Sequence, residues 1–135
     1  MQSTTWLRIA AGLAAFQTVG HTIGAVLAGP SSPEEAALRA TMGAFRVSLM
    51  GIERSYWDFY LGSGWAITAL AGTVTAVIWL LVPIARATPH AARPIILSLA
   101  GGFAAVTLIS ALYFVTAPIV IAALITICLV VAARP

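Results

Sequence analysis

The stretch PIILSLAGGFAAVTLISALYFVTAPIVIAALITICLVVAA, residues 94–133, decides the fold class, because it runs for 40 residues without a charged side chain. About 20 apolar residues in a helix are enough to cross the ~30 Å hydrocarbon core of a bilayer. As one helix, this stretch would be about 60 Å long at ~1.5 Å per residue, roughly twice what a membrane needs. The chain must therefore fold back within it. Pro118 is the expected break, since proline cannot continue the helical hydrogen-bond ladder.

Two further stretches, residues 9–33 and 59–85, also lack charged side chains. The whole chain is 61% hydrophobic and 8% charged, against roughly 45–50% and about 25% in soluble domains. A segment surrounded by lipid must satisfy its own backbone hydrogen bonds, which favours helices. The sequence therefore predicts an all-α fold, a four-transmembrane-helix bundle in a single integral membrane domain over residues 1–135. The predicted spans cover residues 6–28, 60–82, 95–115 and 118–133.

The connection between the first two predicted spans holds all four acidic residues. Residues 31–35 supply an N-cap, a proline and two acids, which is typical of a helix start. Apolar residues then recur at helical spacing, so we expect an amphipathic interfacial helix over residues 33–52, with a bend at Gly51. The later connection, residues 83–94, has a proline at each end and predicts a plain helix–helix turn.

The distribution of arginines bears on orientation and on partners. The chain has seven arginines, no lysine and a formal charge of +3, but the arginines form no basic patch, so nucleic acid is not an expected partner. Four spans would put four arginines on the side of both termini and three on the other side. The positive-inside rule then predicts a multi-pass protein of the cell inner membrane with both termini in the cytoplasm. The first group is Arg8, Arg86, Arg93 and Arg134, and the second is Arg39, Arg46 and Arg54.

His21 lies within the first predicted span, at hydrocarbon depth. Ionisable side chains at that depth are costly and usually face protein or a polar cavity. Gln17 is one turn earlier on the same face, and Thr22 is adjacent. One interpretation is that a neutral His21 makes one interhelical hydrogen bond that fixes packing. The other is a functional histidine, which requires a carboxylate partner.

Such a carboxylate could come from residues 53–60, which precede the second predicted span. If this segment is helical, Arg54 and Asp58 are one turn apart and Glu53 lies beside Trp57. The simpler interpretation is a surface ion pair that anchors the helix end. A histidine beside a carboxylate can instead exchange a proton near neutral pH. The catalytic candidates are therefore His21, Asp58 and Glu53, and the substrate-binding candidates are Gln17, Arg46, Arg54, Tyr56, Trp57 and Tyr60.

The sequence predicts no metal site and no cofactor. One histidine in the membrane with one or two carboxylates falls short of the three or four ligands of a zinc site. A haem held axially by His21 is an alternative, but a lone histidine on an apolar helix is a signal of low specificity. Cys128 is the single cysteine, so a disulfide or a paired-thiol site within one chain is excluded.

The motif Gly-His-Thr-Ile-Gly at residues 20–24, followed by Arg-Ser-Tyr-Trp-Asp-Phe-Tyr at residues 54–60, resembles an uncharacterised family of small four-span bacterial membrane proteins. The resemblance covers the first half of the chain. It implies the four-span architecture and the choice of His21, Arg54 and Asp58, but no reaction. Ser63 is a departure, since such proteins often have Gly-Phe-Gly at this place.

These observations lead to one main functional hypothesis and two alternatives. We expect a membrane-embedded binder of a lipophilic small molecule, and its enzymatic version would perform acid–base chemistry such as isomerisation, cyclisation or epoxide opening. The alternatives are an accessory or structural subunit of a membrane complex and a small exporter. The expected partners are the lipid bilayer, the lipophilic molecule and a second copy in a homo-oligomer.

Overall fold

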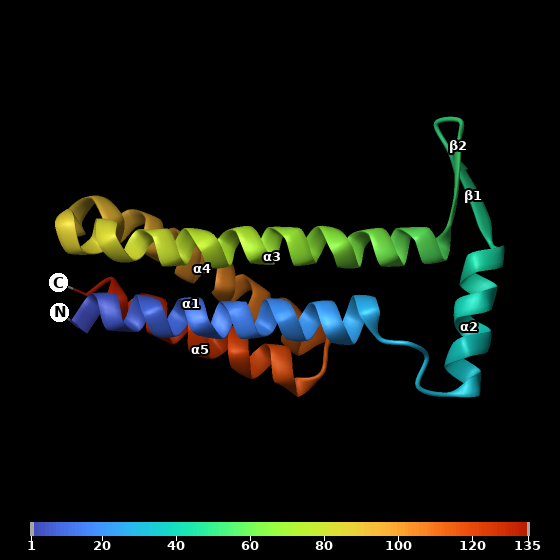
Figure 1. The fold of residues 1–135 in the computed structure, drawn as a ribbon, viewed down its shortest axis with the longest axis horizontal. Helices are drawn as coiled ribbons and strands as arrows, with labels where there is room; N and C mark the ends of the chain where they lie inside the picture. Colours follow the sequence, from blue (N-terminus) through green and yellow to red (C-terminus); the bar gives the residue numbers. More distant parts are fainter. Residues whose placement is uncertain (1, 135) are drawn as a thin grey trace. The chain divides into compact units, whose positions relative to one another are not determined.

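A computed structural model describes residues 2–134 (Figure 1). The prediction of a helical fold is confirmed, because most of these residues are in helices. The described chain contains five α-helices, one π-helical segment that continues α1, and one antiparallel pair of strands. The elements are α1 (Gln2–His21), η1 (Thr22–Leu27), α2 (Pro33–Ala44), β1 (Arg46–Leu49), β2 (Ile52–Ser55), α3 (Tyr56–Ala87), α4 (Pro89–Tyr113) and α5 (Thr116–Ala132).

Three helices, rather than the predicted four, are long and apolar enough to cross a membrane among the described residues. They are Ser3–Leu27, Tyr56–Ala87 and Pro89–Tyr113. The predicted fourth span corresponds to α5, which is also apolar but has only 17 residues. It is shorter than the three membrane-length helices because the chain turns back at Phe114 and Val115 and the helix stops at Ala132.

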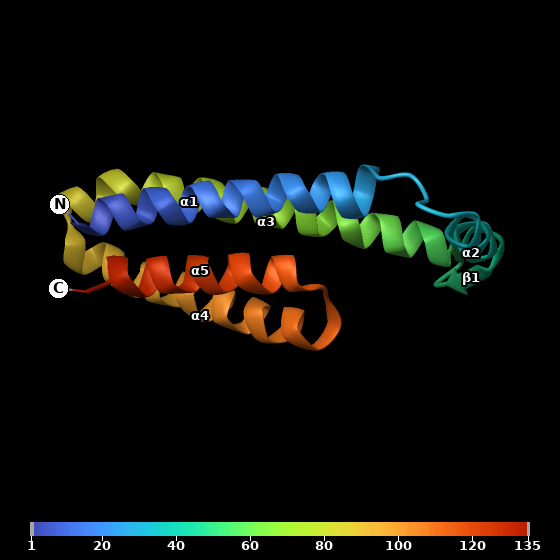
Figure 2. The ribbon, with the colours of Figure 1, turned by 90° about the horizontal axis from the view of Figure 1, so that it is seen from below.

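The chain divides into two compact units. The first joins residues up to Thr18 with residues from Ala71 onward, and the second is Val19–Leu70. In the first unit, α4 and α5 pack side by side as a helical hairpin (Figure 2). The core of this unit is apolar and draws on all four helices. Its fully buried large side chains are Leu7, Ile78, Ile96, Ile125 and Leu129.

The predicted helix–helix turn is present, but its predicted bounds, residues 83–94, are wrong. Pro83 lies inside α3 and Pro94 lies inside α4, so the connection shrinks to Thr88. Pro89 occupies the first position of α4, where a backbone N–H has no helical partner to lose. Thr88 closes α3 as its N–H donates to the Ile84 carbonyl oxygen at 2.7 Å. Pro83 and Pro94 therefore do not mark the ends of the connection, although their positions in the sequence suggested that they do.

The predicted amphipathic helix over residues 33–52 is present only as α2, which ends at Ala44. Strands β1 and β2 follow as a hairpin, with Arg46 opposite Ser55 and Leu49 opposite Ile52. The two residues of the turn both have positive φ, 55° at Met50 and 81° at Gly51. Positive φ at both positions is the signature of the tight turn that matches strand twist. The expected bend at Gly51 is thus the centre of a hairpin.

Candidate functional site

The start of α2 is held by a reciprocal set of hydrogen bonds, which includes the predicted N-cap. The Ser32 hydroxyl accepts from the Glu35 N–H at 3.2 Å, which makes Ser32 the N-cap. Glu35 Oε2 accepts from the Ser31 N–H at 2.7 Å and from the Ser31 hydroxyl at 2.6 Å. These bonds from Ser31, with the neighbouring Arg39 guanidinium, lower the pKa of Glu35 to about 2. The carboxylate is therefore a fixed structural anion.

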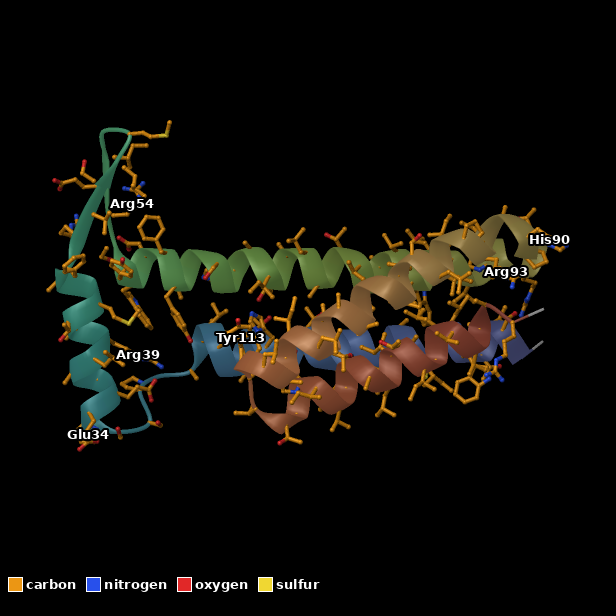
Figure 3. The ribbon with its side chains drawn as sticks, turned by 180° about the vertical axis from the view of Figure 1, so that it is seen from behind. Glu34, Arg39, Arg54, His90, Arg93 and Tyr113 are labelled. Carbon is orange, nitrogen blue, oxygen red and sulfur yellow. The ribbon has the colours of Figure 1, made fainter. Side chains whose placement is uncertain are left out.

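Arg39 connects three segments of the second unit. Its Nη1 donates to the Ala28 carbonyl oxygen at 2.9 Å, and its Nε donates to Glu35 Oε1 at 3.0 Å. The guanidinium lies 5.0 Å from the centre of the Trp57 ring, within the range of a cation–π contact. Figure 3 shows Arg39 along α2 and Glu34 at the start of that helix. Arg39 was not among the predicted site residues. Its spacing of four from Glu35 could have indicated an ion pair on one face of a helix.

The condition for pairing Arg54 with Asp58, a helix over residues 53–60, is met only from Tyr56 onward, because Glu53 and Arg54 are in β2. Both Glu53 and Arg54 are exposed, and Arg54 Nη1 donates to the Glu53 carbonyl oxygen at 2.9 Å. The predicted Arg54–Asp58 ion pair does not form. The cation beside Asp58 is Arg46, whose Nη1 lies 4.0 Å from Asp58 Oδ2. The antiparallel register explains this, since Arg46 is opposite Ser55.

Asp58 takes part in a capping box at the start of α3. Its N–H donates to the Ser55 hydroxyl at 3.1 Å, and its Oδ2 accepts from the Ser55 N–H at 2.8 Å. Such a reciprocal pair satisfies two backbone donors that the first turn would otherwise leave free. Ser55 is buried with 3% exposure. The Asp58 carboxylate therefore bonds to the backbone N–H of Ser55 and caps the start of α3.

Aromatic side chains surround this capping box. Trp57 stacks on Tyr60 with ring centres 5.2 Å apart, and Tyr56 meets Phe45 edge to face at 5.3 Å. The Tyr56 N–H also donates to the Phe45 carbonyl oxygen at 3.3 Å, which ties the hairpin to α3. Tyr56 and Tyr60 stay about half exposed, at 53% and 47%. The aromatic substrate-binding candidates thus share one junction.

His21 occupies a different place in the same unit. Its side chain is half-buried at the end of α1, and Nε2 lies 3.3 Å from the Gly64 carbonyl oxygen of α3. A carbonyl oxygen can only accept, so Nε2 carries the proton and a neutral ring keeps Nδ1 as a free acceptor. At the next residue, the Thr22 and Thr68 hydroxyl oxygens are 3.1 Å apart. Two polar contacts therefore join α3 to the end of α1 and the start of η1.

Gly64 permits this close approach. A Cβ atom at Gly64 would lie 3.0 Å from Val26 Cγ2, which is tighter than nine in ten real Cβ contacts. With a larger residue at this position, the Val26 side chain would have to shift by a few tenths of an ångström. Gly64 and Thr68 were not predicted as site residues. The signal that could have found them is their spacing of four, which puts both on one face of α3.

The structure does not bring His21 and Asp58 into one hydrogen-bonded pair. Gly64 follows Asp58 by six residues on α3, or about 9 Å along the helix at ~1.5 Å per residue. His21 bonds at the level of Gly64, whereas Asp58 bonds to Ser55. The exposed Glu53 lies on β2, before α3 begins. The catalytic candidates are thus separated along the unit.

Gln17 belongs to the first unit. Its Oε1 is buried and has no hydrogen-bond partner among the described residues. A buried acceptor without a donor is costly, so a polar group is needed there.

Comparison with known proteins adds no family or relative: no family model, curated protein or solved structure matches the chain. The site is therefore interpreted from its own residues and contacts.

Proposed function

We propose that this protein binds a lipophilic small molecule in the membrane and that His21 Nδ1 anchors the polar group of that molecule. The observation that carries the proposal is the bond from His21 Nε2 to the Gly64 carbonyl oxygen at 3.3 Å. It occupies one ring nitrogen and leaves the other as an acceptor on a half-buried side chain. The expected ligand has an apolar body and one hydroxyl or N–H donor.

The surroundings of His21 support a binding role. The backbone changes to a π-helix directly after it, at Thr22–Leu27. Such segments are rare and frequently occur at functional sites. Polar side chains within an apolar span are expensive, and an ionisable one is by default a functional hypothesis. The Thr22 and Thr68 hydroxyls add polar atoms beside it.

Binding is better supported than acid–base catalysis. In the enzymatic version, His21 would exchange a proton with Asp58 or Glu53 as its counterpart. Among the described residues, Asp58 bonds to Ser55 and lies near Arg46, and His21 bonds to Gly64. A ligand donor, rather than a protein carboxylate, is the partner that this geometry leaves for Nδ1.

We also propose that α5 is a fourth span. Its 17 residues extend for about 26 Å at ~1.5 Å per residue, near the lower limit for crossing a bilayer. Arg134 follows it and can extend toward the headgroups. Four spans put both termini on the cytoplasmic side of the inner membrane and α2 at the opposite interface.

The test is the identity of small molecules that co-purify with the protein in mild detergent, measured by mass spectrometry of organic extracts. The proposal predicts one molecule in stoichiometric amount with the unchanged chain, lost from His21→Ala and kept in His90→Ala. His90 is the matched control, since it is the other histidine and lies exposed at the start of α4 (Figure 3). Retention of the molecule by a helical His21→Ala protein would contradict the proposal, as would a stoichiometric protein partner in its place.

A further inference from the structure

A shallow groove runs between α1 and α3 in the first unit. Its volume is about 460 Å³, within the range of ~300–1,000 Å³ typical of ligand sites. The groove exists because small residues line both helices, and a Cβ atom at Gly12 or Gly72 would meet nothing within 4 Å. The small lining residues are Ala11, Gly12, Ala15, Gly72, Thr75 and Ala76.

A second hollow of about 200 Å³ adjoins the groove. Trp79 lines both, so the groove and the second hollow form one surface that we call the Trp79 groove. The second hollow also has Arg8 on α1 and Arg86 on α3, both with exposed side chains. One end of the Trp79 groove is thus apolar and the other end carries two guanidinium groups.

These two arginines have no acidic side chain as a partner among the described residues of their unit. All four acidic residues of the chain lie between residues 34 and 58, in the other unit. The ion pairs among the described residues are Arg39–Glu35 and Arg46–Asp58. Among the described residues of this unit, no acidic side chain can therefore serve as a counter-ion for Arg8 and Arg86. Guanidinium groups match phosphate oxygens in a planar, two-point geometry.

We propose that the Trp79 groove binds one anionic phospholipid, with its phosphate between Arg8 and Arg86 and an acyl chain over Trp79 and the small residues. Basic recesses between transmembrane helices on the cytoplasmic side are where such headgroups bind. A second copy of the chain fits less well. A symmetric dimer through this face would add a second Arg8–Arg86 pair and no acidic side chain from this unit to neutralise it. This site is independent of His21.

The experiment uses Trp79 as a reporter in lipid nanodiscs. Trp6, Trp57 and Trp65 are each changed to Phe, so that Trp79 is the only tryptophan. Nanodiscs of phosphatidylcholine then receive a small, equal mole fraction of phosphatidylglycerol or phosphatidylcholine with brominated acyl chains, because bromine quenches tryptophan on contact. We expect brominated phosphatidylglycerol to quench Trp79 at roughly a tenfold lower mole fraction, since each arginine adds to the attraction for anionic lipid.

Three variants locate the effect. Arg8→Gln with Arg86→Gln abolishes the preference for phosphatidylglycerol. Arg93→Gln with Arg134→Gln removes the same charge from the same unit and keeps the preference. Gly72→Leu fills the groove and lowers the phosphatidylglycerol-specific quenching, while circular dichroism checks that the helices persist.

The proposal is overturned if both headgroups quench the unchanged groove equally. It is also overturned if the Arg93–Arg134 control loses the preference as fully as the Arg8–Arg86 pair, because general surface charge would then explain it. A cross-linked dimer in which neither lipid quenches Trp79 would assign the groove to a second copy instead.

Discussion

At His21, the bond to the Gly64 carbonyl oxygen determines which ring nitrogen carries the proton. A carbonyl cannot donate, so the neutral ring must be the Nε2–H tautomer with a free Nδ1. We predict that ¹⁵N-histidine NMR in lipid shows a protonated Nε2 and an unprotonated Nδ1 for His21. The chain has two histidines, so His90→Ala identifies the His21 signals. A protonated Nδ1 with a bare Nε2 would refute both the hydrogen bond and the proposed anchor.

The lowered pKa of Glu35 leads to a second prediction, which concerns how the stability of the fold depends on pH. Bonds from the Ser31 hydroxyl and N–H, with Arg39, lower its pKa from 4.5 to about 2 in the folded chain. A lowered pKa stabilises the fold above the unfolded value, and this contribution is lost as pH falls from about 4.5 to about 2. We expect the midpoint of thermal unfolding in detergent to fall over this range.

Glu35→Gln should flatten that fall, and Ser31→Ala should shift it to higher pH. Glu53→Gln is the control, because it removes an exposed carboxylate of the same unit but leaves the bonds among Ser31, Glu35 and Arg39. The same pH dependence in Glu35→Gln and in the unchanged chain would show that this carboxylate does not couple to folding.

Individual residues also show how far the sequence could predict the site. The place of His21 in a helix of membrane-spanning length and the N-cap near Ser32 were predictable, because each depends on local sequence. The partner of His21 was not, since a backbone carbonyl has no signature in the sequence. Asp58 had a second available interpretation, the Ser-x-x-Asp spacing of a capping box, which reads as a helix start rather than as catalysis.

At the scale of elements, a sequence pattern with two interpretations explains why the hairpin was not predicted. Apolar residues at Phe45, Val47 and Leu49 alternate with polar ones, a pattern of period two inside a set that also fits helical spacing. A short segment cannot be assigned by periodicity alone. The turn decided the assignment, because positive φ at Met50 and Gly51 forms the tight two-residue connection between β1 and β2.

Met50 has an unfavourable backbone conformation in this turn. It adopts φ of 55°, which is unfavourable for a residue with a large side chain, and it is fully exposed. We predict that Met50→Asn stabilises the hairpin by roughly 0.5–1 kcal/mol, since Asn-Gly is a preferred sequence for such turns. Hydrogen exchange of the β1 and β2 amides should slow by roughly two- to fivefold. Met50→Ala keeps the Cβ penalty and should change little; equal slowing in both variants would rule out the conformational explanation.

For the whole molecule, the exposed surface is the main argument for a membrane. Only 17% of the most apolar window of each membrane-length helix is buried inside the fold. Large apolar residues remain open on α4, with Leu108 at 69% and Leu112 at 75% exposure. Water would penalise this surface by about 25 cal/mol per Å². Lipid tails or partner helices remove that penalty.

The number of spans can be tested by finding the side of the membrane on which the loops and the end of α5 lie. In a Cys128→Ser background, we predict that Met50→Cys reacts with a membrane-impermeant maleimide in cells with a permeabilised outer membrane. Thr88→Cys and Arg134→Cys should react only after lysis, because four spans put the Thr88 turn and the end of α5 on the cytoplasmic side. If α5 does not cross, Arg134→Cys reacts from outside while Thr88→Cys stays protected. Reaction of Thr88→Cys from outside with protection of Met50→Cys would invert the whole topology and show that the four-to-three arginine bias does not set it.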